Sequence, residues 1–420
     1  MDFISSKNIF LLTRDTLKLI DKRLMKHGSR TAYIVYKMME CKGNFEKFEM
    51  AEFAMLATLH DIGAYKTDNL GDMLRLEMRE PLPHSIYGYL FINNLSPLKE
   101  KAKILLYHNL DYSGLKQLDF PYKDIAGYIN FAEKVDIYHN ALGSKFDYSM
   151  FNQHAGTKYA EEAISLFSQA QLKYNIFHKI ETDEYEEELD ELMDYIMFTN
   201  EEKKQAMEML MYCLSFRSKY KVVDSVTCVC ICEEIAKFME FDKAAIVKLY
   251  YGALLHDIGM LAIPKSLIDS EKIFSKEDRE LMETHVEVTE RILENRMDKE
   301  VLAIALAHHE RLDGKGYPKG LKGSELNQSQ KILQVADAMT AMLNTRLHRK
   351  PMSKQEIIAS LNEEASENGL SKEIVKVVSE NYDYIIKKAK EESEQMLLRH
   401  KQMNEKFSQV YGTFKGKGRD

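Results

Sequence analysis

Residues 308–318 read HHERLDGKGYP and directly follow the apolar run VLAIALA of residues 301–307. The apolar run predicts a helix, and Gly314, Gly316 and Pro318 predict a defined turn after it. Neutral imidazole is the commonest metal-binding side chain, so His308 and His309 at a helix–loop junction indicate a metal site. A histidine pair alone fits a structural role equally well, and the polar residues elsewhere in the chain decide between the two interpretations.

Three further polar sites interrupt apolar helical segments between residues 254 and 338. They are the His-Asp pair in LLHDIG (254–259), His285, and the aspartate in QVADA (334–338). A buried His-Asp pair is costly unless its charge and lone pairs are satisfied, so these sites favour one shared metal centre over separate core pairs. In that centre Asp257 would bridge two metals, and the other ligands would be His256, His285, His308, His309 and Asp337. Two divalent ions held in this way activate a bridging water and neutralise phosphate charge.

The order of these motifs, with its His-His-Glu and Gly-Tyr-Pro signature, resembles the HD-GYP subgroup of HD-domain phosphohydrolases over roughly residues 219–378. The resemblance implies an all-helical fold, two or three iron or manganese ions, and hydrolysis of cyclic di-GMP or a related cyclic dinucleotide. The resemblance also implies that His256 and Asp257 form the catalytic centre. Arg346 and Arg349 fall on positions associated with the substrate phosphates, although two surface arginines near a helix end would look the same. Tyr317 either packs in the loop or touches a nucleotide.

Two positions depart from the pattern of the resembled subgroup. Asp224 stands where a leading histidine is usual, and Met260 stands where a lysine is usual. Aspartate binds the same hard divalent ions, so Asp224 either preserves a metal position as a seventh ligand or marks the loss of one. Met260 removes a cation that could meet the scissile phosphate. The alternative function is therefore a weakly active or inactive scaffold that binds a cyclic dinucleotide in signalling.

An internal repeat relates the two halves of the chain. LHDIG occurs at residues 59–63 and again at 255–259, the gap from His84 to His108 equals that from His285 to His309, and the gap from His108 to Asp136 equals that from His309 to Asp337. Equal spacing in two halves is the sign of a duplication, so we expect tandem HD domains. The first copy lacks Gly-Tyr-Pro but offers a second metal site from His27, His60, Asp61, His84, His108 and Asp136. Hydrolysis of another nucleotide by this copy is a further alternative.

Composition limits the remaining possibilities. Hydrophobic residues make up 45% and charged residues 30%, and the net charge of −8 argues against broad binding of nucleic acid or anionic membranes. No run approaches the ~20 apolar residues that a membrane span needs, so we expect no membrane segment. The start of the chain lacks a secretory pattern. Five cysteines, an odd number, form no disulfide framework, and Cys228, Cys230 and Cys232 are expected to pack in the core. These features predict a cytoplasmic protein.

Glycine and proline are sparse, and Met, Leu, Lys and Glu abound, so the fold is predicted to be all-α: two tandem HD-domain helical bundles plus a C-terminal helix. We expect an N-terminal HD-like domain at residues 1–150, a helical connector at 151–200, an HD-GYP domain at 201–380, and a helix with a basic tail at 381–420. The expected partner is a cyclic dinucleotide, with no nucleic acid and no membrane. Helical surfaces such as the last helix could serve in a homodimer.

Overall fold

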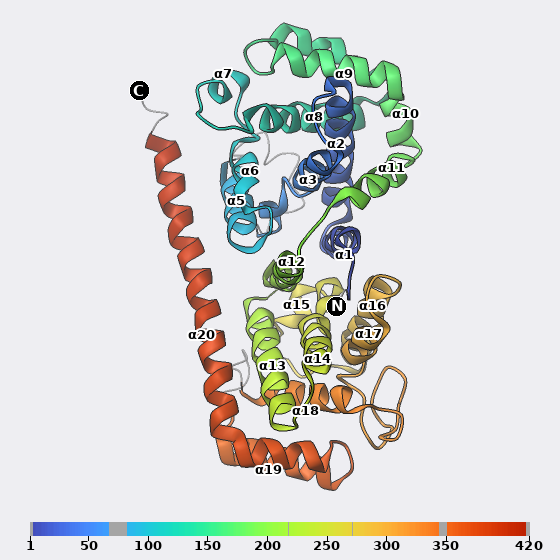
Figure 1. Ribbon diagram of the computed structural model, residues 1–420, viewed down its shortest axis with the longest axis vertical. Coiled ribbons are helices and arrows are strands. Elements are labelled where there is room, and N and C mark those ends of the chain that lie inside the picture. The colour runs from blue at the N-terminus through green and yellow to red at the C-terminus, as the bar shows by residue number, and fades with distance from the viewer. Residues whose placement is uncertain (1–2, 67–81, 217, 271, 344–350, 417–420) are drawn as a thin grey trace. The chain divides into compact units, whose positions relative to one another are not determined.

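The computed structural model describes residues 3–66, 82–216, 218–270, 272–343 and 351–416 (Figure 1). These residues form helices joined by short loops. No β-strand occurs among them, and the only β-type pairing there consists of isolated bridges between Ala155 and Tyr159 and between Asp313 and Lys322. The all-α prediction is confirmed.

The chain divides into two compact units. The N-terminal unit comprises Ser6–Ala206 with Met403–Asp420, and the C-terminal unit comprises Met207–Gln402 with Met1–Ser5. Residues 151–200, which we expected to be a connector, lie within the N-terminal unit. The last helix, α20 (Lys372–Gly416), begins earlier than residue 381 and contributes residues to both units.

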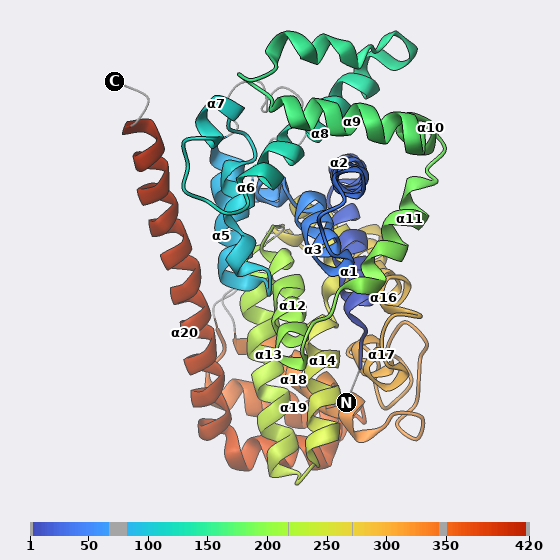
Figure 2. The same cartoon turned by 45° about the horizontal axis from the view of Figure 1, so that its top comes forward.

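In the N-terminal unit, α2 is the central helix, and α3, α8 and α9 contact it (Figure 2). Tyr33, Ile34 and Met38 of α2 are fully buried in this arrangement. The elements are α1 (Ser6–Lys18), α2 (Lys22–Lys42), α3 (Lys47–Thr58), η1 (Ile62–Lys66), α5 (Leu82–Leu95), η3 (Lys99–Lys101), α6 (Lys103–Tyr107), α7 (Tyr112–Leu115), α8 (Lys123–Leu142), η4 (Gly143–Lys145), η5 (Tyr148–His154), α9 (Glu161–Tyr174), α10 (Ile176–Glu181), α11 (Tyr185–Leu192) and η6 (Met193–Tyr195). α12 (Asn200–Tyr212) follows and crosses into the other unit.

In the C-terminal unit, α13 contacts both α14 and α18, and α17 covers α14 (Figure 1). The elements are η7 (Cys213–Phe216), α13 (Lys219–Phe238), α14 (Lys243–Leu255), η8 (Ile258–Ala262), α15 (Lys265–Ile268), α16 (Lys276–Leu293), α17 (Lys299–Leu306), α18 (Gln328–Leu343), α19 (Lys354–Ser366) and most of α20. A reciprocal capping box between Ser275 and Asp278 sets the start of α16, the helix that carries His285.

One segment of this unit bears on the expectation that no membrane span is present. Lys243–Ala262 is long and apolar enough to pass for a membrane span by length and composition. However, 67% of its apolar window is buried inside the protein, as expected for the core helix of a bundle. The His256-Asp257 pair lies within this segment, directly after α14, and both residues are buried.

The same close backbone approach occurs in both units. A Cβ atom on Gly63 would lie 2.1 Å from the carbonyl oxygen of His84, and one on Gly259 would lie 2.0 Å from that of His285. Only glycine tolerates such contacts, so each LHDIG motif docks against the helix that carries the next histidine. The duplication read from the spacing is therefore present in the packing as well.

Candidate metal centre

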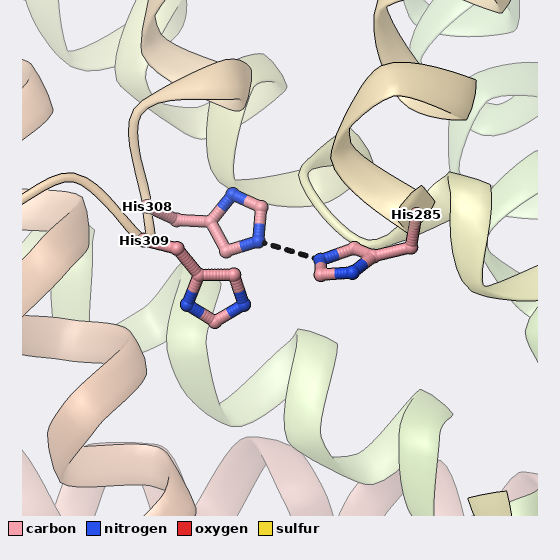
Figure 3. Close-up of side chains that lie close together, drawn as sticks. All are labelled: His285, His308 and His309. Atoms are coloured by element: carbon pink, nitrogen blue, oxygen red, sulfur yellow. Dashed lines mark hydrogen bonds between the residues drawn. The ribbon is translucent and has the colours of Figure 1, made fainter. Parts of the chain in front are cut away.

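Asp257 lies at the centre of the candidate site in the C-terminal unit, and five helices bring the other predicted ligands to it. His256 and Asp257 directly follow α14, and His308 and His309 follow α17 after a single intervening residue. His285 projects from α16, Asp224 from α13 and Asp337 from α18. Figure 3 shows the rings of His285, His308 and His309 gathered together, with the Nε2 atoms of His285 and His308 3.1 Å apart.

Backbone carbonyls fix the orientation of three of these rings. The Nδ1 atom of His256 lies 2.7 Å from the oxygen of Ala253, and that of His308 lies 2.8 Å from the oxygen of Ala305. His285 makes the same contact with Met282 at 2.6 Å. A carbonyl only accepts, so each Nδ1 carries the proton and each Nε2 keeps its lone pair. Metal-binding histidines are held in this way, and the donor set therefore fits divalent ions.

The two carboxylate oxygens of Asp257 face different groups. Oδ1 lies 3.5 Å from His285 Nε2 and 3.9 Å from His308 Nε2. Oδ2 lies 3.7 Å from His256 Nε2, which in turn is 3.8 Å from Asp337 Oδ1. A carboxylate placed between two groups of nitrogen and oxygen ligands is suited to bridging two cations.

Burial and neighbouring charge set the protonation of these groups. Burial lowers the pKa of His285 and of His309 to about 4, and it also lowers the pKa of His308. Burial alone would raise the pKa of Asp257, but Lys221 and the surrounding histidines outweigh it and hold that pKa well below its usual range. At neutral pH the site therefore presents neutral imidazoles and an ionised carboxylate, the forms that bind metal ions.

Cys228 is buried, as predicted from the sequence, and it also lies in a second group of candidate ligands with His256 and Asp337. Ligand atoms of Cys228, His256 and Asp337 all lie within 4.8 Å of one another, and those of His285, His308 and His309 meet the same limit. Asp224 and Cys228 are four residues apart on α13 and therefore share one face of the helix. In the sequence, this four-residue spacing from Asp224 was the only indication that Cys228 could lie at the site.

Lys221 was also not predicted from the sequence to lie at the site. Its ammonium lies 2.9 Å from Asp257 Oδ2, on the side of the carboxylate that faces His256. It stands one helical turn before Asp224 on α13, so both side chains reach the same cavity.

Glu310 holds the loop that follows the histidine pair. Its carboxylate accepts hydrogen bonds from the backbone N–H groups of Lys319 at 2.7 Å and Leu321 at 2.9 Å. A Cβ on Gly316 would lie 2.4 Å from the backbone nitrogen of Arg311, so this position requires glycine. The N–H of Tyr317 donates to the carbonyl of His309, and the two rings lie 4.7 Å apart. The loop thus closes back on His309.

A cavity of about 760 Å³ opens over the candidate ligands. Asp224, Asp257, His285, His309 and Asp337 line it, as do the cationic residues Lys221, Lys272 and Arg279. Its apolar lining includes Met260, Ile268, Ile273, Phe274, Met282 and Tyr317. A volume of this size, with both cations and apolar side chains, is suited to a nucleotide-sized anion. The predicted phosphate contacts Arg346 and Arg349 lie outside the described residues.

Residues 204–370 match the family model described as an HD domain. This part of the chain is therefore similar to HD domains. A 3′3′-cGAMP-specific phosphodiesterase of Vibrio cholerae is 25% identical over 377 residues, which cover 85% of this chain and 87% of that protein. A cyclic di-GMP phosphodiesterase of Thermotoga maritima is 37% identical over 126 residues, which cover 29% of this chain and 34% of that protein.

A solved structure shows the same fold over most of the chain. The crystal structure of a cyclic GMP-AMP-specific phosphodiesterase of V. cholerae matches with a TM-score of 0.59 and 15% identity, covering 91% of this chain and 98% of that one. The match therefore extends beyond the HD domain of residues 204–370 into the N-terminal unit. The sequence resemblance that rested on the His-His-Glu and Gly-Tyr-Pro residues is confirmed at the level of the family.

The N-terminal unit brings the first-copy residues of the HD pattern together as well. Ligand atoms of His27, His60 and Asp61 lie within 4.8 Å of one another, and so do those of Asp61, His84 and His108. A third such group contains His60, His108 and Glu133, a residue that sequence reasoning missed. Glu133 lies one turn before Asp136 on α8, and this spacing could have indicated from the sequence that Glu133 lies near the cluster. Asp136 itself is hydrogen-bonded to Arg30 and His27.

Proposed function

We propose that the C-terminal HD domain is a metal-dependent phosphodiesterase that hydrolyses a cyclic dinucleotide such as cyclic di-GMP or 3′3′-cGAMP. The observation that carries this proposal is the position of Asp257, whose two oxygens face two separate groups of ligands at the wall of a cavity. The relatives named above act on these two dinucleotides, which supports the substrate class.

Two groups of side chains would hold the ions. The first comprises His285, His308 and His309 with Asp257 Oδ1, and the second comprises His256, Asp337 and Cys228 with Asp257 Oδ2. Asp224 lines the same cavity and would serve as an additional ligand of the second group, because it shares a face of α13 with Cys228. Iron or manganese suits imidazole and carboxylate ligands. Bound divalent ions would supply an activated water and neutralise charge at the phosphorus.

The protein's own residues position the substrate. Lys221, Lys272 and Arg279 present positive charge inside the cavity, where phosphate groups would be attracted. Phe274, Tyr317 and the other apolar side chains offer surfaces for the bases. Glu310 keeps the loop closed on His309, so its role is to orient the ligand pair. Arg346 and Arg349 remain predicted phosphate contacts.

Binding of a cyclic dinucleotide without hydrolysis is the second candidate. The ion pair between Lys221 and Asp257 favours it, because an ammonium at Oδ2 competes with a cation in the second group. Met260 also lines the cavity where a lysine would add positive charge. In this case the protein would act as a signalling scaffold.

The test is product analysis after anaerobic purification with iron or manganese, with cyclic di-GMP and 3′3′-cGAMP as substrates. We expect linear dinucleotide or mononucleotide products, and we expect Asp257→Ala to abolish them together with most of the bound metal. Asp383→Ala is the matched control, because Asp383 is exposed and pairs only with Lys354 among the described residues. If metal-loaded protein binds the dinucleotide but forms no product, the result would contradict hydrolysis and favour the scaffold function.

Two further expectations extend the proposal. All five cysteines are free thiols, which supports a reducing compartment such as the cytoplasm. Homodimerisation through helical surfaces stays a prediction, to be checked by light scattering of the full chain.

A further inference from the structure

One buried hydroxyl group of the C-terminal unit bonds to two backbone groups of the His-Asp motif. The backbone N–H of Gly259 donates to Thr289 Oγ1 at 3.0 Å, and Thr289 Oγ1 donates to the carbonyl oxygen of His256 at 3.2 Å. Thr289 lies on α16 and is completely buried. A hydroxyl group has one donor and two acceptor sites, so this side chain makes both bonds at once.

These two bonds hold the backbone on both sides of Asp257. His256 precedes Asp257 in the chain, and Gly259 follows it after one intervening residue. α14 ends directly before His256, so the carboxylate stands where one helix stops and η8 has yet to begin. A carbonyl at a helix end has no partner within its helix, and the Thr289 hydroxyl supplies one to His256.

The helix that carries Thr289 also carries His285, one turn earlier. Side chains four residues apart lie on the same face of a helix. His285 Nε2 lies 3.5 Å from Asp257 Oδ1, while Thr289 bonds to the backbone around Asp257. α16 therefore contacts the His-Asp motif at two points, and the hydrogen bonds at Thr289 fix the distance between His285 and the carboxylate.

The same hydroxyl links the two groups of candidate ligands. His285 belongs to the first group, and His256 belongs to the second. Asp257 Oδ1 faces His285, and Oδ2 faces His256. Thr289 thus fixes the backbone of one ligand from the second group against the helix that supplies a ligand to the first.

The first copy of the repeat has no side chain at the equivalent position. Gly88 follows His84 by four residues and therefore corresponds to Thr289. A Cβ on Gly88 would lie 3.4 Å from the carbonyl oxygen of His60 and 3.6 Å from the backbone nitrogen of Gly63. These two atoms stand at the same places in the first LHDIG motif as the two partners of Thr289 do in the second. The N-terminal unit has the same pair of backbone groups, but Gly88 places no hydroxyl between them.

We propose that Thr289 is a positioning residue of the candidate metal centre, whose hydroxyl keeps the His256-Asp257 backbone in register with His285. This role rests on the proposed phosphodiesterase function. Valine would fill nearly the same space, but it would leave the N–H of Gly259 and the carbonyl of His256 without this partner. Groups that orient metal ligands typically contribute about 10- to 100-fold to metal affinity or activity.

The experiment compares the full unmodified chain with Thr289→Val, Thr289→Ser and Thr340→Val. Manganese is titrated into each metal-free protein and followed by electron paramagnetic resonance, and the manganese that Asp257→Ala fails to bind is assigned to this centre. The kcat and KM for 3′3′-cGAMP and cyclic di-GMP are measured on the metal-loaded proteins. Every measurement is made below the melting temperature of the variant concerned.

We expect Thr289→Val to bind manganese at this centre about 10-fold more weakly and to lower kcat by about 10-fold. The KM should stay nearly unchanged, because Thr289 is not among the residues that line the cavity. Thr289→Ser keeps the hydroxyl and should restore both the manganese affinity and kcat.

Thr340→Val separates positioning from stability. Thr340 is a buried threonine of the same unit, and its hydroxyl donates to the carbonyl of Ala336 in its own helix. Its replacement should lower the melting temperature without weakening the binding of manganese. Equal losses of affinity in Thr289→Val and Thr340→Val would assign the effect to stability and overturn the inference.

The remaining outcomes also decide the role of Thr289. Unchanged affinity and kcat in Thr289→Val would overturn it, and so would equal losses in Thr289→Val and Thr289→Ser, because the hydroxyl would then make no difference. If the unmodified chain binds manganese through Asp257 but forms no product, the phosphodiesterase function fails, and the manganese affinities of the variants alone support or overturn the role of Thr289. A chain that binds no manganese through Asp257 would overturn both.

Discussion

The ammonium of Lys221 lies 2.9 Å from the oxygen of Asp257 that faces His256. A fixed cation therefore already lies beside one of the two oxygens proposed to bridge metal ions. The strength of this ion pair sets how readily the second group of ligands takes up its ion.

We predict that Lys221→Met raises the affinity of the second metal position by about 2- to 5-fold, because a partly buried ion pair is worth roughly 1 kcal/mol or less. Titration of manganese into metal-free protein, followed by electron paramagnetic resonance, measures this affinity. Lys272→Met is the matched control, since Lys272 lines the cavity but makes no ion pair with Asp257. An unchanged or weaker affinity in Lys221→Met would show that the lysine does not compete with the ion.

Cys228 gives the second group of ligands a spectroscopic signature. We predict that cobalt-substituted protein shows a sulfur-to-cobalt charge-transfer band in the near ultraviolet, and that Cys228→Ser removes this band while binding of cobalt persists. Thiolate ligands select soft and borderline metals, so the serine variant should also shift its preference toward manganese. Cys230→Ser, two residues along α13, should leave the band intact. A band that survives Cys228→Ser would exclude the thiol as a ligand.

Gly259 controls the contact between the His-Asp motif and α16. Since a Cβ there would lie 2.0 Å from the carbonyl oxygen of His285, Gly259→Ala must displace that helix. We predict a loss of about 1–3 kcal/mol in the free energy of unfolding, together with weaker metal binding. Denaturant unfolding and metal content measure the two effects. Gly412→Ala, where a Cβ meets no atom within 4 Å in helix α20, should instead be neutral or stabilise by about 0.5–1 kcal/mol.

Ionisation of Glu40 makes the stability of the N-terminal unit depend on pH. Burial would raise its pKa, but hydrogen bonds from Lys37 and Lys47 outweigh burial and lower the pKa to about 2. Because the folded pKa lies below the unfolded value, the ion pairs contribute stability above pH ~4.5, and this contribution is lost as the pH falls toward 2. We predict that Glu40→Gln costs about 1 kcal/mol at pH 7 and nothing near pH 2. Equal costs at both pH values would contradict the assignment.

The sequence located most of the candidate centre because its ligands interrupt apolar helices. His256, His285, His308 and Asp337 stand out against buried neighbours, and the structure brings them together with Asp257 and Asp224. Cys228 did not stand out, because a cysteine in an apolar helix looks like a core residue. Only its helical offset from Asp224 connects it to the site.

Tertiary contacts account for what the sequence pattern could not indicate. The equal spacing that made Asp136 a candidate ligand carries no information about Arg30, which contacts it from another helix. Likewise, composition separated residues 151–200 as a connector, whereas packing of α9 against α2 makes them part of the N-terminal unit. Spacing identifies equivalent positions, but the partners of those positions depend on the fold.

His60, His108, His256 and His308 each lie just beyond the end of a helix and donate to a carbonyl in its last turn. Those carbonyls have no partner within their helices, so a single hydrogen bond completes the helix end and fixes the ring. The conformational entropy of arranging these ligands is therefore lost during folding and not when an ion arrives. An ion can consequently leave and another enter without refolding, so the supply of metals in the cell would decide which one is bound.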